Sequence, residues 1–380
     1  MNANGNISFT GNVAAEGGAI SLIYAELAMN DNGSISFCEN LASGRGGAIY
    51  AFGEGHYGIL ELRNNESVLF EKNAETEKDV YRLRSIYIES NSYYTDHSVS
   101  LSVAAGKSIE FRDSMYVGTG APVNLNADYT KDGTVTIKQQ GDILFTGKYT
   151  EQHLNELLEE SHLGRKASPE EILSSRTTEV NTMTNLYGGY LRVEDGAIYM
   201  GQGITVHEGS DATVLVKNAT LNHDGFALTF NAGTTLQVQG DSLVLGNLVL
   251  LAGSTLNIEG EITVDGTLTL GQGLTLSGDI LSDIRNLQGG QSLTLVSGLE
   301  SLAVQTQELM RSVEYTGVLS GQELVAADYF SNLQGVGNLV LVYNEAAGTV
   351  SITTQTIPEP GTATLSLLAL AGLCARRRRK

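Results

Sequence analysis

The feature that most constrains the fold of this chain is a short motif that recurs five times before residue 150. Each copy is a β-branched residue, any residue and then Phe, so in a β-strand its two apolar side chains face the same way. Successive Phe residues are 28, 33, 41 and 34 positions apart, which is within the range of solenoid coils. We therefore expect the copies to stack in successive coils about 4.8 Å apart. The copies are Ile7-Ser8-Phe9, Ile35-Ser36-Phe37, Val68-Leu69-Phe70, Ile109-Glu110-Phe111 and Ile143-Leu144-Phe145.

Two further patterns follow the first copies of this motif. Phe9, Phe37 and Phe70 are each followed three residues later by Asn, and Gly-Gly-Ala-Ile occurs at 17–20 and 46–49. We expect each Asn to end its strand, where the amide bonds local backbone or joins an Asn ladder. The glycine pairs supply turns that residues with a Cβ resist. These features predict that Ile7, Phe9, Ile35 and Phe37 are buried and stacked in adjacent coils, although an antiparallel sandwich has similar strands and turns.

The strings GNISFTGN and SFCENLASGRGGAIYA resemble the FxxN and GGA[ILV] repeats of polymorphic outer-membrane proteins. The resemblance covers residues 5–75 closely and 76–150 loosely. That family is similar to autotransporters, whose passenger is a right-handed parallel β-helix at the cell surface. The resemblance thus implies an all-β fold, a right-handed parallel β-helix or solenoid, for residues 1–150.

The character of the sequence changes over residues 151–186, where we expect a short helical insertion. Leu154, Leu157 and Leu158 lie at helical spacing among acidic residues. Ser168 and Pro169, followed by two Glu, have the pattern of an N-cap, a proline at the first helical position and an acidic first turn. We expect a helical hairpin on the side of the solenoid, either as a tolerated surface insertion or as a partner-binding projection.

Strand patterns return over residues 187–296 with short aliphatic coils. Apolar-x-apolar triplets begin 5 to 8 residues apart and have glycines between them. Three such segments predict a triangular coil of roughly 18–20 residues. Residues 297–356 mix strand and helix patterns, as expected of a C-terminal cap over the last coil. The triplets begin at Leu236, Leu243, Leu248, Leu256, Ile262, Leu268 and Leu274.

The end of the chain, residues 357–380, has three parts in a fixed order. Pro358-Glu359-Pro360 is followed by an apolar run from Ala363 to Ala375, which predicts a C-terminal hydrophobic helix of marginal membrane-spanning length. The last five residues are all basic and predict that the body lies on the opposite side of the membrane. These basic residues are Arg376, Arg377, Arg378, Arg379 and Lys380.

This order of a Pro-Glu-Pro motif, an apolar segment and a basic cluster resembles the PEP-CTERM sorting signal. The resemblance implies an exosortase-type processing enzyme as a partner and the inner membrane as a temporary contact of the tail. Pro358, Glu359 and Pro360 match the recognition motif, residues 361–375 the membrane segment and residues 376–380 the stop-transfer cluster. The family also carries an N-terminal signal peptide, and since the start of this sequence does not read as one, we expect a truncated or misassigned start.

Charge and composition restrict the classes of function. Without the five terminal cations, 18 basic and 43 acidic residues leave the body with a charge of −25, which opposes binding to nucleic acid. The two cysteines predict no disulfide framework, and the six histidines have no metal-ligand spacing. We expect no cofactor, no metal and no catalytic residue. Asp132, Asp195, Asp224 and Asp265 each precede Gly, which is first a turn signal.

The sequence therefore predicts an exported, non-enzymatic protein of the cell surface or extracellular matrix, with a structural or adhesin-like role. It would lie in the cell envelope or outside the cell, with a single C-terminal membrane segment before processing. Extracellular polysaccharide and other surface proteins are its candidate partners. The alternative is a β-helical polysaccharide lyase or glycoside hydrolase, which two or three carboxylates about 5–9 Å apart in a groove would favour.

Overall fold

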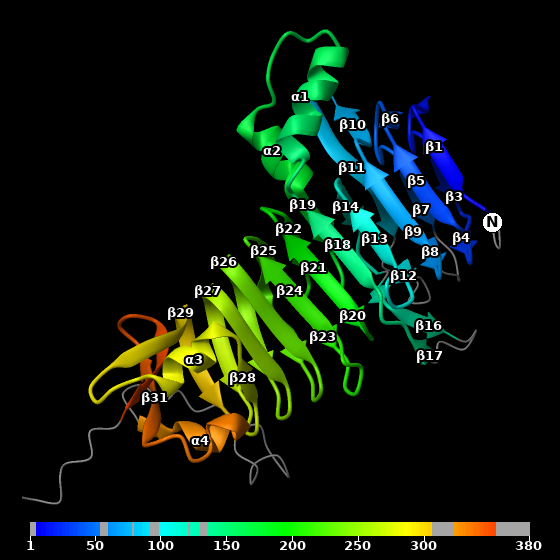
Figure 1. The fold of residues 1–380 in the computed structure, drawn as a ribbon. Helices are drawn as coiled ribbons and strands as arrows, with labels where there is room; N and C mark the ends of the chain where they lie inside the picture. Colours follow the sequence, from blue (N-terminus) through cyan, green and yellow to red (C-terminus); the bar gives the residue numbers. More distant parts are fainter. Residues whose placement is uncertain are drawn as a thin grey trace, which may run out of the picture.

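The computed structural model describes residues 5–53, 60–77, 80–90, 99–120, 122–129, 135–305 and 323–354. These residues form a long stack of parallel coils with three strand-bearing faces, capped at its C-terminal end (Figure 1). Nearly all strand pairs between coils are parallel and in register, so the expected all-β parallel β-helix is confirmed and the antiparallel sandwich is wrong. The sorting residues predicted at 357–380 lie outside the described residues.

The first face carries the Phe motif. Its strands are β1 (Ile7–Thr10), β5 (Ser34–Cys38), β9 (Ser67–Glu71), β13 (Ser108–Phe111), β18 (Asp142–Thr146), β21 (Tyr190–Glu194), β24 (Thr213–Lys217), the first parts of β26 (Thr235–Leu250) and β27 (Thr255–Leu270), and β28 (Thr275–Ser277).

The second face follows the first around each coil. Its strands are β3 (Ile20–Ile23), β7 (Ile49–Gly53), the second part of β11 (Val80–Ser90), β14 (Ser114–Val117), β19 (Thr177–Val180), β22 (Ile198–Gly201), the first part of β25 (Thr220–Phe230), and the middle parts of β26 and β27.

The third face closes the coil. Its strands are β4 (Leu27–Asn30), β8 (Leu60–Arg63), β12 (Val99–Ser102), β15 (Val123–Leu125), β20 (Thr184–Leu186), β23 (Ile204–Val206), the last parts of β25, β26 and β27, and the end of β29 (Ser292–Val304). An antiparallel hairpin, β16 (Ala127–Tyr129) with β17 (Val135–Lys138), extends from this side.

The Phe residues of the five motifs form one continuous stack inside the helix. Neighbouring ring centroids are 4.6 to 4.9 Å apart and the ring planes differ by no more than 6°. Ile35 and Phe37 are 1% and 0% exposed, as predicted. Ile7 and Phe9 are stacked on Ile35 and Phe37 as predicted, but their predicted burial is wrong: both are half-buried, with no described coil on their outer side. The irregular spacing of the motifs is absorbed outside the strands, so their register is preserved.

The aliphatic coils of the second half repeat every 20 residues, with Thr235 beside Thr255 and Thr255 beside Thr275. One predicted triplet is out of phase. Leu243 and Leu245 point outward and are half-buried, whereas Ser242 and Val244 point inward. The neighbouring coils explain which side chains face inward, because Val244 is the register partner of Leu221 and Val264, which are both buried.

Two helices occupy the corner between the first and second faces, α1 (Thr150–Glu160) and α2 (Pro169–Arg176). Helix α2 begins as predicted, with Ser168 as N-cap, Pro169 in the first turn and a capping box completed by Glu171. In the earlier coils the same corner holds β2 (Val13–Ala14), β6 (Leu41–Ala42) and β10 (Ala74–Glu77). The first part of β11 follows β10 in this corner as an antiparallel strand, and α2 lies against the other edge of β11 (Figure 1).

The C-terminal end is closed by an antiparallel sheet rather than by another coil. Its order is β29, β32 (Thr349–Thr354), β31 (Leu339–Asn344) and β30 (Glu323–Val325), with α3 (Asp279–Arg285), α4 (Ala326–Tyr329) and η2 (Ser331–Leu333) beside it. In the part of the chain that the structure describes, no helix has the length and apolar character needed to span a membrane. The predicted C-terminal hydrophobic helix falls outside that part and stays a prediction.

Candidate functional site

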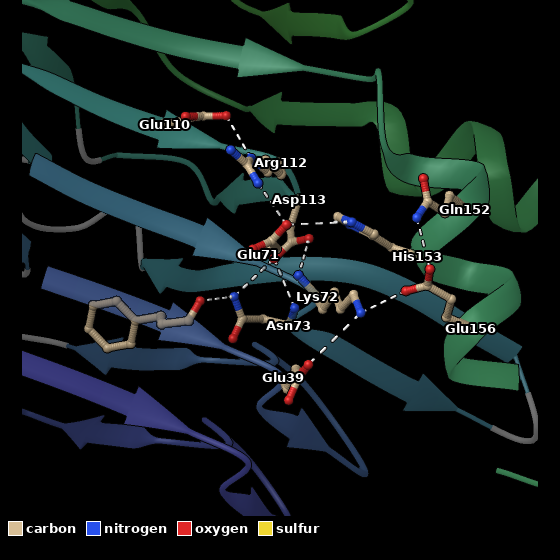
Figure 2. Close-up of polar contacts among 11 residues, drawn as sticks. Glu39, Glu71, Lys72, Asn73, Glu110, Arg112, Asp113, Gln152, His153 and Glu156 are labelled. Carbon is tan, nitrogen blue, oxygen red and sulfur yellow. Dashed lines mark hydrogen bonds and ion pairs between the residues drawn. The ribbon is translucent and has the colours of Figure 1, made fainter. Parts of the chain in front are cut away.

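A group of connected polar contacts lies at the corner where the Asn ladder comes close to α1 (Figure 2). The FxxN asparagines stack from coil to coil: Asn12 Nδ2 donates to Asn40 Oδ1 at 2.8 Å, and Asn40 Nδ2 donates to Asn73 Oδ1 at 2.8 Å. Asn40 and Asn73 are fully buried, and their amides also donate to the carbonyl oxygens of Phe9 and Phe37. The ladder predicted as one option for these residues is therefore present.

The ladder ends on a carboxylate that the sequence analysis did not single out, Asp113. Its oxygens accept hydrogen bonds from the backbone of Lys72 and Asn73, the Asn73 amide and the Ser85 hydroxyl, at 2.8 to 2.9 Å. Asp113 is only 3% exposed. Burial raises its pKa from 3.8 to about 6, while the donated hydrogen bonds limit the rise. Its signal in the sequence is weak, because Asp113 follows Phe111 by two residues instead of three.

Arg112 connects the acidic side chains on the outer surface of the first face. Its guanidinium contacts Glu71 and Glu110 at 2.7 Å each and lies 4.8 Å from the ring centroid of Tyr149. Burial opposes the charge of Arg112, but the hydrogen bonds to Glu110 and Glu71 outweigh it and raise the pKa. The carboxylates of this cluster are thus held by a cation.

Helix α1 is bound to this surface by its first two turns. His153 Nε2 lies 3.5 Å from Glu71 Oε1, and the His153 ring is stacked on Tyr149. Lys72 Nζ contacts Glu156 of α1 at 2.6 Å and Glu39 of the neighbouring coil at 3.9 Å. Burial lowers the pKa of His153. Figure 2 shows His153 and Glu156 of the helix beside Glu71 and Lys72, which belong to one coil.

Helix α2 covers the adjoining sheet edge, where the first part of β11 pairs antiparallel with β10. The carboxylate of Glu171 accepts from the backbone of Tyr81 at 3.0 Å, and Ser175 Oγ accepts from the backbone of Leu83 at 2.9 Å. Hydrogen bonds from Arg165 are the main reason that the pKa of Glu171 is lowered to about 2. The helical insertion therefore satisfies edge amides that otherwise have no sheet partner.

An open groove of about 310 Å³ lies further along the stack, at the start of the second face. Asp241 of β26 and Glu261 of β27 line it and are register partners, with Asn218 and Thr263 beside them. Both carboxylates are exposed. The hydrolase alternative is favoured by two or three carboxylates about 5–9 Å apart in a groove, and these two carboxylates lie in one groove on adjacent coils. Asp195, Asp224 and Asp265 do not line this groove.

Across the described ranges, no three His, Cys, Asp or Glu side chains are placed to hold a metal ion. The contacts around Asp113 and Arg112 are closed within the protein: Asp113 joins successive coils, and Arg112 holds Glu71, which His153 of α1 also contacts. The predicted sorting residues Pro358, Glu359, Pro360 and 376–380 cannot be placed beside this cluster, because they lie outside the described residues.

The described residues thus form a capped parallel β-helix whose first coils carry FxxN and GGA[ILV] repeats, with a helical insertion packed beside the Asn ladder. Two family models match parts of this chain. Residues 356–380 match the PEP-CTERM protein-sorting motif, and residues 6–22 and 34–51 match the Chlamydia polymorphic membrane protein repeat. Both resemblances are therefore confirmed, and the sorting motif implies an exported protein processed by an exosortase. Comparisons with curated proteins and with solved structures give no significant match.

Proposed function

We propose that this chain is a non-enzymatic surface protein whose β-helix acts as an adhesin-like or matrix-associated stalk, sorted through its tail by an exosortase. The observation that carries the proposal is the match of residues 356–380 to the sorting motif, on a chain whose body is a parallel β-helix. A long, self-supporting stack suits display at a distance from a membrane, because each coil is stabilised by its neighbours.

In this proposal Pro358, Glu359 and Pro360 are the recognition motif. Pro360 disfavours helical backbone at Glu359, and Pro358 fixes its own φ, so the segment is held extended for a processing enzyme. Residues 361–375 insert briefly into the inner membrane, and Arg376 to Lys380 stop further transfer.

Intact-mass measurement on protein recovered outside an exosortase-bearing host tests this processing. We expect the mature form to end near Pro360, and Glu359→Ala to leave the full chain in the membrane fraction. Glu345→Ala, in the exposed turn between β31 and β32, is the matched control and should be processed normally. External protein that still carries 373–380, or unaltered release of the Glu359 variant, contradicts the proposal.

The stalk role itself is tested by binding to extracellular polysaccharides and to other surface proteins of the same host. We expect binding without chain cleavage, and no binding to DNA or RNA because the body carries a charge of −25 from 18 basic and 43 acidic residues.

A second candidate function, hydrolysis or lyase cleavage of a polysaccharide, is favoured by one observation, the Asp241–Glu261 pair in its groove. Measurable cleavage of acidic or neutral polysaccharides that is lost in both Asp241→Asn and Glu261→Gln would replace the non-enzymatic proposal. Glu259→Gln is the control, because Glu259 already accepts a hydrogen bond from Gln239 and does not line the groove.

A further inference from the structure

His153 of α1 is buried between the helix and the coils, with one ring nitrogen unpaired. It is 4% exposed, and its ring is stacked on Tyr149 with the centroids 5.5 Å apart. Nε2 faces Glu71 Oε1 at 3.5 Å, whereas Nδ1 is buried and has no partner among the described groups. This geometry fits a neutral ring that carries its proton on Nε2 and leaves a bare lone pair on Nδ1.

Protonation of His153 is unfavourable in this position. The second proton would go to Nδ1 and create a buried donor without an acceptor. The nearest carboxylates offer little compensation, because each already holds a cation: Glu71 contacts Arg112 at 2.7 Å, and Glu156 contacts Lys72 at 2.6 Å. Burial is the main reason that the pKa of His153 is lowered, and Lys72 and Arg112 act in the same direction, against Glu71 and Glu156.

Two neighbouring carboxyl groups also titrate on acidification, with opposite effects on α1 and on the coils. The hydrogen bond from Lys72 lowers the pKa of Glu156, so this contact stabilises the docked helix at neutral pH and is lost as the pH falls. Burial raises the pKa of Asp113 to about 6, so the coils beneath are stabilised when Asp113 is protonated. Acidification should therefore weaken the docking of α1 without opening the coils. The other charged or titratable groups that face His153 or its partners are Glu39, Glu71, Glu110, Arg112, Lys148 and Tyr149.

Helix α2 is held by groups that do not titrate in the same range. Glu171 accepts from the backbone of Tyr81 at 3.0 Å, and Ser175 Oγ accepts from the backbone of Leu83 at 2.9 Å. Because hydrogen bonds from Arg165 lower the pKa of Glu171 to about 2, Glu171 stays ionised in mild acid. A capping box begins α2, whereas α1 has no side-chain cap. The two helices of the insertion should thus respond differently to acid.

We propose that His153 is a pH-sensitive latch: when the pH falls from about 7 to about 5, its protonation releases α1 from the coils while α2 stays docked. In the released helix, water accepts the hydrogen bond from Nδ1 that the protein interior cannot. Release uncovers Leu154 and Leu158, which are fully buried in the docked helix, and the corner residues Ala74 and Leu83, against which Leu154 packs. Acidification thus opens an apolar surface beside the Asn ladder.

Amide exchange of the full chain at about pH 7 and about pH 5 tests the latch, with rates expressed as protection factors so that the intrinsic pH dependence of exchange cancels. We expect protection of α1 to fall by about threefold to twentyfold, because a released histidine with a pKa of 6.5 takes up a proton that the docked ring resists. Protection of α2 should change by less than about twofold. Unchanged α1, or equal losses in α1 and α2, would overturn the proposal.

Three variants separate the histidine from the other contacts. His153→Gln should abolish the pH dependence of α1 protection, because an amide does not titrate, whereas His162→Gln, in the exposed turn after α1, should leave it intact. Glu156→Gln should lower α1 protection at both pH values but keep the pH dependence, since it weakens only the contact with Lys72. A pH dependence that persists in His153→Gln contradicts the latch.

Titration of the His153 ring by NMR in the unmodified chain keeps the test decisive even if His153→Gln releases α1 at neutral pH. The ring should titrate with a midpoint below 6.5, and the loss of α1 protection should follow the same curve. A midpoint at or above 6.5, or a loss of protection at a different pH, would overturn the proposal.

Discussion

Phenylalanine occupies the same inward position in five successive coils, and each ring in the middle of the row is stacked on both faces. Phe37, Phe70 and Phe111 are completely buried, so each contributes its full apolar surface to the core. Beyond Phe145 the same row continues with Val193, Val216 and Val238. At this scale the core changes from aromatic to aliphatic without a change of register.

Replacing Phe37 by Ala should lower the free energy of unfolding by about 3–5 kcal/mol, because it removes a buried ring and leaves a cavity between two stacked neighbours. Urea unfolding monitored by circular dichroism measures the loss. Phe9→Ala is the internal control and should cost clearly less, since Phe9 is half-buried and stacked on one face. Equal losses for the two variants would contradict the burial gradient along the row.

Asp113 should make the protein less stable as the pH rises from about 4 to 6. Burial raises the pKa of Asp113 from 3.8 to about 6, so in this interval the folded state holds a proton that the unfolded state has released. Its contribution is complete below pH 3.8 and is lost through pH 6. Asp113→Asn should flatten the stability profile in that window, which unfolding free energies at a series of pH values will show.

His223 should have the opposite effect on stability, which should increase as the pH rises. Burial lowers its pKa from 6.5 to about 4, and its Nε2 has no partner among the described groups. The unfolded state binds the proton first, so stability present above pH 6.5 is lost as the pH falls toward 4, by on the order of 3 kcal/mol. His223→Gln should remove this loss, whereas His162→Gln, in the exposed turn after α1, should not. A profile unchanged by His223→Gln contradicts the assignment.

The motif residues could be predicted because each acts through its neighbours in sequence. Phe37, two residues after Ile35, shows the strand period directly in the sequence, and Asn40 marks the strand end. Asp113 could not be predicted in the same way, because its role depends on a register that spans 41 residues between Phe70 and Phe111. His223 gives no sequence signal of burial, since a lone His in a strand reads equally well as exposed.

At the scale of secondary-structure elements, the helical insertion acts as a covering for a sheet edge. Helix α1 is held by polar contacts of His153 and Glu156 with Glu71 and Lys72 of one coil, while α2 supplies acceptors to the first part of β11. Leu154 packs with Ala74 and Leu83 in a small separate core under the helices. Docking of the insertion thus combines apolar contact with completion of backbone hydrogen bonds.

Glu171→Gln should weaken this covering. The carboxylate accepts from Arg165, Ser168 and the Tyr81 backbone, and an amide has one acceptor oxygen instead of two. We expect a loss of about 1–3 kcal/mol and faster amide exchange at Tyr81 and Leu83 than at the Phe row. Glu170→Gln is the matched control, because Glu170 is exposed in the same helical turn. A similar effect of both variants would contradict a specific role for Glu171.

The beginning of α2 was predictable from local chemistry, since Ser168, Pro169 and Glu171 form a cap within four residues. The contacts of α2 with β11 were not, because they join positions about 90 residues apart. The phase error at Leu243 has the same origin. Residues 243–245 are Leu-Val-Leu, so from the sequence either the two leucines or the valine could face inward. The buried neighbours Leu221 and Val264 on the adjacent coils show that Val244 faces inward.

For the whole molecule, coils contact their immediate neighbours, so stability should be distributed along one dimension. We expect native-state amide exchange to begin in β1, β3 and β4, which among the described residues have a neighbouring coil on one side, and to be slowest in the coils of Phe70 and Phe111. Exchange measured residue by residue at neutral pH tests this order. Uniform protection from the first coil to the cap would contradict it.

The overall architecture was predictable because a solenoid repeats its information in every coil. The two ends are less predictable, since the sequence pattern of each end occurs only once. The mixed pattern after residue 297 gave no indication that β29 starts at Ser292 and both extends the third face and pairs with β32. The function of the tail rests on its sequence match alone.

The position of β32 also has a mechanical consequence. The described fold ends at Thr354, the last residue of β32, and this strand lies between β29 and β31 with antiparallel pairing to both. A pull applied through the following residues would load two rows of hydrogen bonds in shear, so many bonds must break together. The coils behind them, whose hydrogen bonds run along the stack, would instead be peeled one at a time. The closing sheet would thus resist such a pull over the whole length of β32.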